Sequence, residues 1–246
     1  MKCFLLFSML LVANALDIRR SDTVIFGRDG GITHEDIPGI GCLDDDRTCS
    51  AVVVSARSFL TAAHCVERFR DADRLFARFG SDRDEDVIPV PVQKCIIHPQ
   101  YNEAIRDFDI SVCTVDDNIE GRSIRRVIIA EENPIERRLG RIIGSGINRE
   151  TDVSTIIRDI TVPILDISEC RRIVNEPYIT DRMICSGAFG AASCRDSDIG
   201  PLTNDDNELL GIPSWHRECA QHLRPGIFTY VLDPAIRSFI REQAGV

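Results

Sequence analysis

The sequence predicts an all-β fold, a sandwich or a barrel, built from many short strands. Turn-forming residues divide the 246-residue chain into short runs rich in β-branched side chains, which is the pattern of all-β domains. Hydrophobic residues make up 43% of the chain, enough for one sizeable domain or for two fused barrels that share a core.

Eight runs bounded by turn-forming residues stand out as strands, and most of them are rich in β-branched or aromatic side chains. Pro91 lies inside the longest run, and because proline donates no backbone hydrogen bond, we expect an edge strand or a bulge there. In chain order the predicted strands are Ala51–Ser55, Leu75–Phe79, Val87–Ile97, Ile110–Val115, Arg141–Gly144, Ile156–Val162, Leu209–Pro213 and Gly226–Val231.

Two helices are also expected, each after an aspartate that can accept hydrogen bonds from the free amides of a first helical turn. The first covers Ile167–Ile173, after Asp166. The second covers Ala235–Gln243, after Asp233-Pro234, and proline suits a first helical position. Its apolar residues share one face: Ile236, Phe239 and Ile240.

The first 15 residues have the pattern of a secretory signal peptide. Lys2 precedes an apolar run from Phe4 to Val12, and Ala13-Asn14-Ala15 offers a cleavage site. The run is far too short to span a bilayer, and the alternative is a buried N-terminal helix. We predict a protein that is secreted to the extracellular space after removal of residues 1–15.

Cleavage changes the cysteine count and the charge. Loss of Cys3 reduces ten cysteines to nine, and loss of Lys2 lowers the net charge from −10 to −11. An odd count in an oxidising compartment predicts at least one free or intermolecular thiol. The acidic chain is not expected to bind nucleic acid, whereas a basic protein partner is electrostatically favoured. No membrane partner is expected, and the oligomeric state is left open.

Three motifs, far apart in the chain, point to one class of protein. The first, Leu60-Thr61-Ala62-Ala63-His64-Cys65, holds a histidine beside a cysteine; alone, such a pair would suggest a structural or metal-binding role. The second is Asp107-Phe108-Asp109-Ile110, and the third runs from Cys194 to Leu202 as Cys-Arg-Asp-Ser-Asp-Ile-Gly-Pro-Leu. Together they resemble the histidine, aspartate and serine motifs of the trypsin/chymotrypsin-like (S1) serine proteases.

This resemblance extends from about Val24 to the C-terminus and includes further family-like segments. It implies two six-stranded antiparallel barrels at residues 24–125 and 126–232 and a C-terminal helix at 233–243, after a short pro-like segment at 16–23. It implies no cofactor and no metal site. The further segments are Val162–Leu165, Met183–Cys185, Ser214-Trp215 and Pro225–Thr229.

The resemblance also implies three disulfides: Cys49–Cys65, Cys170–Cys185 and Cys194–Cys219. The resemblance does not assign the pairing of three further cysteines. Cys95 and Cys113 would lie on neighbouring antiparallel strands of this fold, close enough to bridge. Cys42 is then the candidate for the unpaired thiol.

The third motif departs from the family at the nucleophile. By resemblance, His64 is the base and Asp109 the carboxylate that orients it, but Asp198 occupies the position of the attacking serine. An ionised carboxylate only accepts hydrogen bonds, and its acyl adduct would be a poor intermediate for peptide cleavage. The sequence therefore predicts a degenerate triad.

Residues of the oxyanion hole and of the activation site also differ from the family. Asp196 and Ile199 replace glycines around the oxyanion hole, where the first adds negative charge and the second restricts the backbone. Ser197 replaces the aspartate that receives the new N-terminus during zymogen activation. The segment Val24–Asp29 occupies the activation site and lacks the usual preceding basic residue.

The specificity pocket is altered in part. Ser214, Trp215 and Gly226 match the family, whereas Ala192 stands at the pocket floor in place of an aspartate that selects Arg or Lys. His216 replaces a glycine and is predicted to obstruct the pocket mouth; an exposed loop histidine without a role is the alternative.

These losses predict a secreted pseudoprotease that acts by binding protein. One alternative is an active endopeptidase that uses Ser197 in an unusual register, and another is a decoy for protease inhibitors or substrates. More narrowly, the chain resembles the inactivated serine protease paralogues of the scabies mite, relatives of the mite group 3 allergens. That resemblance implies interference with host complement proteins.

Overall fold

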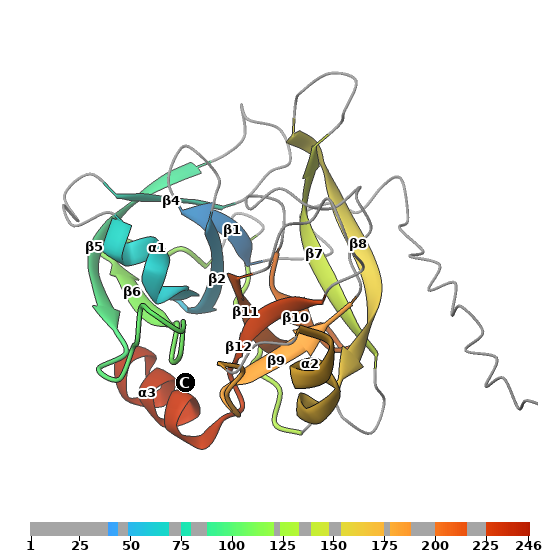
Figure 1. The fold of residues 1–246 in the computed structure, drawn as a ribbon. Coiled ribbons are helices and arrows are strands. Elements are labelled where there is room, and N and C mark those ends of the chain that lie inside the picture. Colours follow the sequence, from blue (N-terminus) through green and yellow to red (C-terminus); the bar gives the residue numbers. More distant parts are fainter. Residues whose placement is uncertain are drawn as a thin grey trace, which may run out of the picture.

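Two closed antiparallel barrels lie side by side (Figure 1), which confirms the predicted fold class. The computed structural model describes residues 39–43, 49–68, 75–79, 88–120, 124–132, 139–147, 154–174, 178–187, 200–215 and 225–246. For Cys42, Ile88 and residues 144–147 and 154–160 it gives the backbone alone. The predicted signal peptide and pro-like segment lie outside the described residues.

The first barrel closes in the strand order β1-β2-β3-β6-β5-β4. Its interior holds mostly aliphatic side chains together with an edge-to-face pair, Phe59 and Phe79, whose ring centroids are 5.7 Å apart. The strands are β1 Ile40–Leu43, β2 Cys49–Ser55, β3 Ser58–Thr61, β4 Phe76–Phe79, β5 Ile88–Ile97 and β6 Ser111–Val115.

The second barrel closes in the strand order β10-β11-β12-β9-β8-β7. Leu209 and Ile212 of its strand β11 belong to the same apolar cluster as the first barrel, so the two cores are in contact. The strands are β7 Leu139–Ile147, β8 Ser154–Leu165, β9 Met183–Ser186, β10 Leu202–Thr203, β11 Leu209–Trp215 and β12 Gly226–Tyr230.

Strand β5 shows how a proline-containing strand fits into a closed barrel. Its first part, up to Pro91, pairs with β4, and its second part, from Val92, pairs with β6. The register shifts between Val92 and Lys94, so the expected bulge is present and the alternative of an edge strand is wrong. Pro91 lies where the strand changes partner, so a missing N–H is tolerated there.

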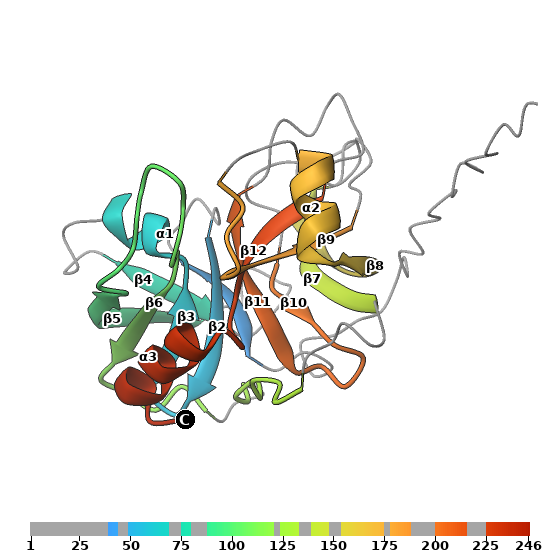
Figure 2. The same cartoon turned by 60° about the horizontal axis from the view of Figure 1, so that its bottom comes forward.

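Three helices are present in the described part of the chain: α1 Ala63–Arg68, α2 Ile167–Val174 and α3 Pro234–Ala244. Asp166 caps α2, accepting a hydrogen bond from the backbone N–H of Glu169 at 2.9 Å. Asp233 caps α3 in the same way, and the apolar face of α3 packs on the first barrel (Figure 2). None of these helices is long and apolar enough to cross a bilayer.

A partly buried ion pair joins the first barrel to the second. Asp107 precedes β6, and its two carboxylate oxygens accept hydrogen bonds from Nε and Nη2 of Arg182 at 2.8 and 2.9 Å. The hydroxyl of Thr180 donates a third, at 2.7 Å. Burial alone would raise the pKa of Asp107, but these hydrogen bonds and the guanidinium charge outweigh it and hold the pKa below its usual value.

An aromatic stack extends this ion pair to α3. The guanidinium of Arg182 lies 4.9 Å above the ring of Phe108, and that ring stacks on His98 at 4.5 Å. His98 in turn meets Phe239 of α3 at 4.7 Å. The stack fixes the loop between β5 and β6, which carries Asp109.

Stability is expected to fall in mild acid because of His98. Burial lowers its pKa, although Asp233, Asp107 and a backbone hydrogen bond to Ala235 oppose the shift. The unfolded chain therefore binds more protons below a pH of about 6.5 than the native protein does, and stability is lost as pH falls. Urea unfolding at pH of about 7.5 and 5.5 should show this loss, and the loss should be smaller in His98→Gln. An unchanged pH dependence in the variant would contradict this assignment.

Candidate functional site

His64 is placed by a strand that ends and a helix that begins beside it. Strand β3 ends at Thr61, and Ala62 and Ala63 are buried at 2% and 0% exposure, so α1 starts close against the barrel. His64 is the second residue of α1. Its imidazole is 19% exposed.

Asp109 lies opposite His64 and is completely buried. Its Oδ2 is 2.8 Å from Nδ1 of His64, and its Oδ1 accepts a hydrogen bond from the backbone N–H of His64 at 2.9 Å. Since an ionised carboxylate cannot donate, Nδ1 carries the proton and Nε2 carries the lone pair. The pair can thus hold an imidazole with Nε2 ready to accept a proton.

Two hydroxyl groups of the second barrel complete the environment of Asp109. Ser214 donates from its hydroxyl to Oδ2 at 2.5 Å, and Thr229 donates to the backbone carbonyl at 2.8 Å. A buried carboxylate is costly without such donors. Sequence reasoning assigned Ser214 to the specificity pocket and missed this contact, because it joins residues 105 positions apart.

Removing this hydroxyl is expected to destabilise the fold. Ser214→Ala leaves the buried Asp109 with one donor fewer, and a hydrogen bond to a charged group contributes about 2 kcal/mol. Ser168→Ala is the matched control, because the Ser168 hydroxyl donates to Asp166 at an exposed site; it should cost less than about 0.5 kcal/mol. Equal losses of unfolding free energy in the two variants would argue against the role of Ser214.

Arg106 is a second residue that sequence reasoning missed. Its Nη1 lies 3.8 Å from Oδ2 of Asp109 and is buried, yet it finds no hydrogen-bond acceptor among the described residues. Arg106 and Phe108 both have positive φ values, 55° and 52°, which side-chain-bearing residues rarely adopt. The strained loop therefore places a guanidinium beside the carboxylate, where it shares in balancing the negative charge.

Two further predicted pocket residues lie on strand β11, which carries Ser214, and on its neighbour β12. Trp215 is the last residue of β11 and pairs with Ile227, and Gly226 begins β12. Trp215 packs against the apolar cluster around α2 and β9. Ala192 and His216 lie outside the described residues.

The nucleophile motif is described only at its C-terminal end. Leu202 in β10 pairs with Ile142 on one side and with Gly211 on the other. The backbone N–H of Ile143 donates to the carbonyl of Pro201 at 3.4 Å. Strand β10, which begins at the last residue of the motif, is thus held on both sides. Four predicted site residues lie outside the described part: Asp196, Ser197, Asp198 and Ile199.

Three disulfides are present in the described part of the chain. Cys49–Cys65 and Cys170–Cys185 join the expected partners. Cys95 and Cys113 are opposite residues on β5 and β6 and also form a disulfide, with Cα atoms 4.0 Å apart. Cys194 and Cys219 lie outside the described residues, as does the side chain of Cys42.

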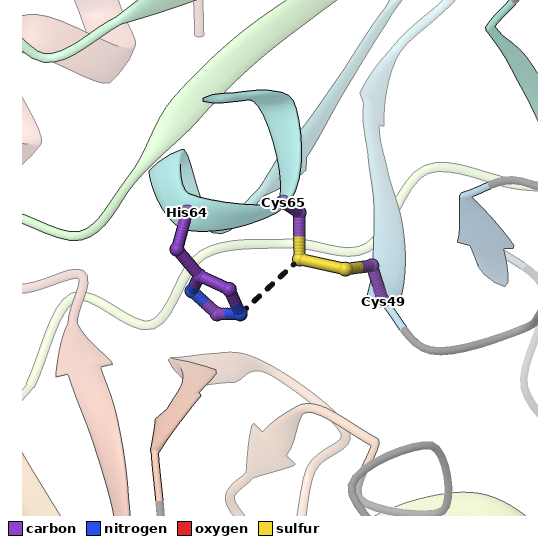
Figure 3. Close-up of side chains that lie close together, drawn as sticks. All are labelled: Cys49, His64 and Cys65. Atoms are coloured by element: carbon purple, nitrogen blue, oxygen red, sulfur yellow. Dashed lines mark hydrogen bonds between the residues drawn. A yellow bond between two sulfur atoms is a disulfide. The ribbon is translucent and has the colours of Figure 1, made fainter. Parts of the chain in front are cut away.

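The first of these disulfides adjoins the imidazole. Nε2 of His64 points at Sγ of Cys65 at a distance of 3.4 Å (Figure 3). Both cysteines are nearly inaccessible to solvent, at 5% and 2% exposure. The nitrogen that would accept a proton therefore faces a sulfur atom.

Comparisons with known proteins agree with this geometry. The family model described as Trypsin matches residues 33–238. Trypsin eta of Drosophila erecta is 31% identical over 193 residues, which cover 75% of this chain and 74% of that protein. Trypsin of Phaedon cochleariae is 30% identical over 212 residues, 80% of this chain and 79% of that protein. With two six-stranded barrels, a histidine hydrogen-bonded to a buried aspartate, and this similarity, the chain belongs to the trypsin-like S1 serine protease family.

Proposed function

We propose that this chain is a secreted, catalytically inactive member of the family that acts by binding protein. The observation that carries the proposal is Asp198, which occupies the position of the nucleophilic serine when the motif is aligned on Cys194 and Gly200-Pro201-Leu202, the two ends that match the family. The pairing of Leu202 with strands on both sides supports this alignment, since it anchors the chain four residues after Asp198.

The chemistry of the substituted residues supports inactivity. A carboxylate at position 198 has no proton for His64 to remove and gives no useful acyl intermediate. Asp196 adds negative charge where the oxyanion must develop, and loss of a single oxyanion donor alone costs about 10²- to 10³-fold in turnover. A variant with serine at position 198 would therefore still lack full stabilisation of the oxyanion.

Stability explains why His64, Asp109 and Ser214 persist in an inactive protein. Asp109 is buried with 0% exposure and accepts hydrogen bonds from both of the other residues. Loss of either donor would leave a buried carboxylate partly unsatisfied. The network is therefore retained as part of the structure whether or not catalysis occurs.

A complement protein of a host is the proposed partner. The signal-peptide pattern and the disulfides are typical of a secreted protein, and the narrower resemblance to inactivated mite paralogues suggests the target. The acidic net charge, −10 for the whole chain and −11 without residues 1–15, favours a basic surface on the partner. We expect binding through surface loops rather than through the cleft.

Pull-down from serum tests the proposal. Wild type, Asp198→Ser and His64→Ala should capture the same complement component, identified by mass spectrometry and reproduced with the purified component. Failure to capture any complement protein would reject the partner. Loss of binding in the His64→Ala variant alone would move the binding site into the cleft.

An active endopeptidase that uses Ser197 is the second candidate. The intact contact between His64 and Asp109 favours it, as do the relatives named trypsin. It requires that the motif be shifted by one residue, so that Ser197 takes the place of the nucleophile. Catalysis requires the geometry of this motif to be held within about half an ångström. A decoy for inhibitors is less favoured, because Ala192 and His216 disfavour normal docking; tight association with a trypsin inhibitor would support it.

A further inference from the structure

We propose that reduction of the Cys49–Cys65 disulfide converts this corner of the first barrel into a zinc site, formed by two cysteine thiolates and Nε2 of His64. The three potential ligand atoms lie within 4.8 Å of one another (Figure 3). In the part of the chain that the structure describes, no other group of three such side chains is as close. The proposal does not depend on whether the chain binds complement.

The contact between His64 and Cys65 already has the spacing of two zinc ligands. Nε2 is 3.4 Å from Sγ of Cys65. A tetrahedral zinc ion with ordinary bonds to nitrogen and sulfur places those two ligand atoms about 3.6 Å apart. The Cα atoms of Cys49 and Cys65 are 6.1 Å apart, so rotation about side-chain bonds can bring both sulfur atoms to one ion without moving the strand or the helix.

The imidazole is oriented as metal-binding histidines are. A histidine ligand usually donates its second ring N–H to a carboxylate, which fixes the tautomer and the ring plane. His64 does so through Nδ1 to Asp109 at 2.8 Å, and Ser214 holds that carboxylate in place. The lone pair on Nε2 is thereby directed at Cys65 before any ion binds.

The oxidised protein cannot use this arrangement. Both sulfur atoms are committed to the disulfide, and a cysteine binds zinc only as its thiolate. A disulfide sulfur also has no hydrogen to donate to the lone pair of Nε2. The lone pair therefore faces a neighbour that satisfies it poorly.

A dithiol reductant opens the site. The dithiol transfers two electrons and two protons to the Cys49–Cys65 bond and becomes a disulfide itself, leaving two thiols in the protein. Zn²⁺ then displaces both thiol protons and binds the two thiolates and the neutral imidazole. The metal joins again the same two points of the chain, 16 residues apart, that the disulfide joined.

Cobalt(II) is the probe for this site, because thiolate-bound cobalt absorbs strongly in the near ultraviolet. The full-length secreted chain should show no such band while its disulfides are intact. After treatment with a dithiol it should bind one equivalent with this band, and one equivalent of zinc should remove the band. Zinc should also protect Cys49 and Cys65 from alkylation.

Variants assign the ligands. His64→Ala should weaken binding by at least about tenfold, and Asp109→Asn by about 10- to 100-fold through the orientation of the imidazole. The double variant Cys170→Ser, Cys185→Ser removes a disulfide of similar separation and should bind cobalt like the wild type. Absence of the band, an affinity unchanged by His64→Ala, or a reduced chain that unfolds without binding metal would overturn the proposal.

Discussion

The purified protein is expected to hydrolyse peptides about 10⁶-fold more slowly than an intact serine protease of this fold, because removal of the nucleophile alone costs that much. Asp198 supplies no attacking hydroxyl, and His64 has no proton to accept from it. The rate losses caused by Asp196 and Ile199 do not simply add to the rate loss caused by Asp198, since the parts of such a site act as a unit. A fluorogenic peptide library under single-turnover conditions is the measurement.

Two variants show whether any residual hydrolysis comes from this site. His64→Ala should leave the residual rate unchanged, because without a nucleophile the imidazole has nothing to activate. Asp198→Ser should also stay close to the wild-type rate, because Asp196, Ser197 and Ile199 still differ from the family. A fall in rate on His64→Ala would mean that the histidine is catalysing proteolysis.

Arg182→Met is expected to destabilise the protein by about 2 kcal/mol, because a hydrogen bond to a charged group contributes about 1.5 to 3 kcal/mol and this pair is only partly buried. The Asp107 carboxylate, in a residue 8% exposed, would lose the two hydrogen bonds that hold it. Methionine keeps an apolar chain over Phe108, so the measured loss reports mainly on the ion pair. Urea unfolding is the measurement.

Arg172→Met is the control for this variant. The guanidinium of Arg172 is 3.8 Å from Glu169 and 74% exposed, so its loss should cost less than about 0.5 kcal/mol. Adding Asp107→Asn to Arg182→Met should recover part of the stability, because a neutral amide is less costly to bury alone. A loss below about 1 kcal/mol in Arg182→Met would show that the pair contributes little to joining the barrels.

The sequence predicted the long strands and the caps because those signals are local. Asp233 precedes α3 as its pattern indicates, and strand β11 covers the predicted strand Leu209–Pro213. Strands β1, β3, β9 and β10 were missed, because each has four residues or fewer and so carries too short a pattern to be recognised alone.

The site was predictable only as far as its motifs extend. His64 and Asp109 lie within recognisable motifs, and the structure brings them together. The ion pair between Asp107 and Arg182 and the contact from Ser214 to Asp109 join residues 75 and 105 positions apart. Such contacts depend on how the barrels meet, which no local pattern reveals.

Labelling with a fluorophosphonate tests the central claim most directly, because the reagent modifies only an activated serine and needs no knowledge of the substrate. The account predicts no adduct on the wild-type protein by intact mass, under conditions in which trypsin is fully modified. An adduct that maps to Ser197 and disappears in the His64→Ala variant would show an active protease and contradict the account.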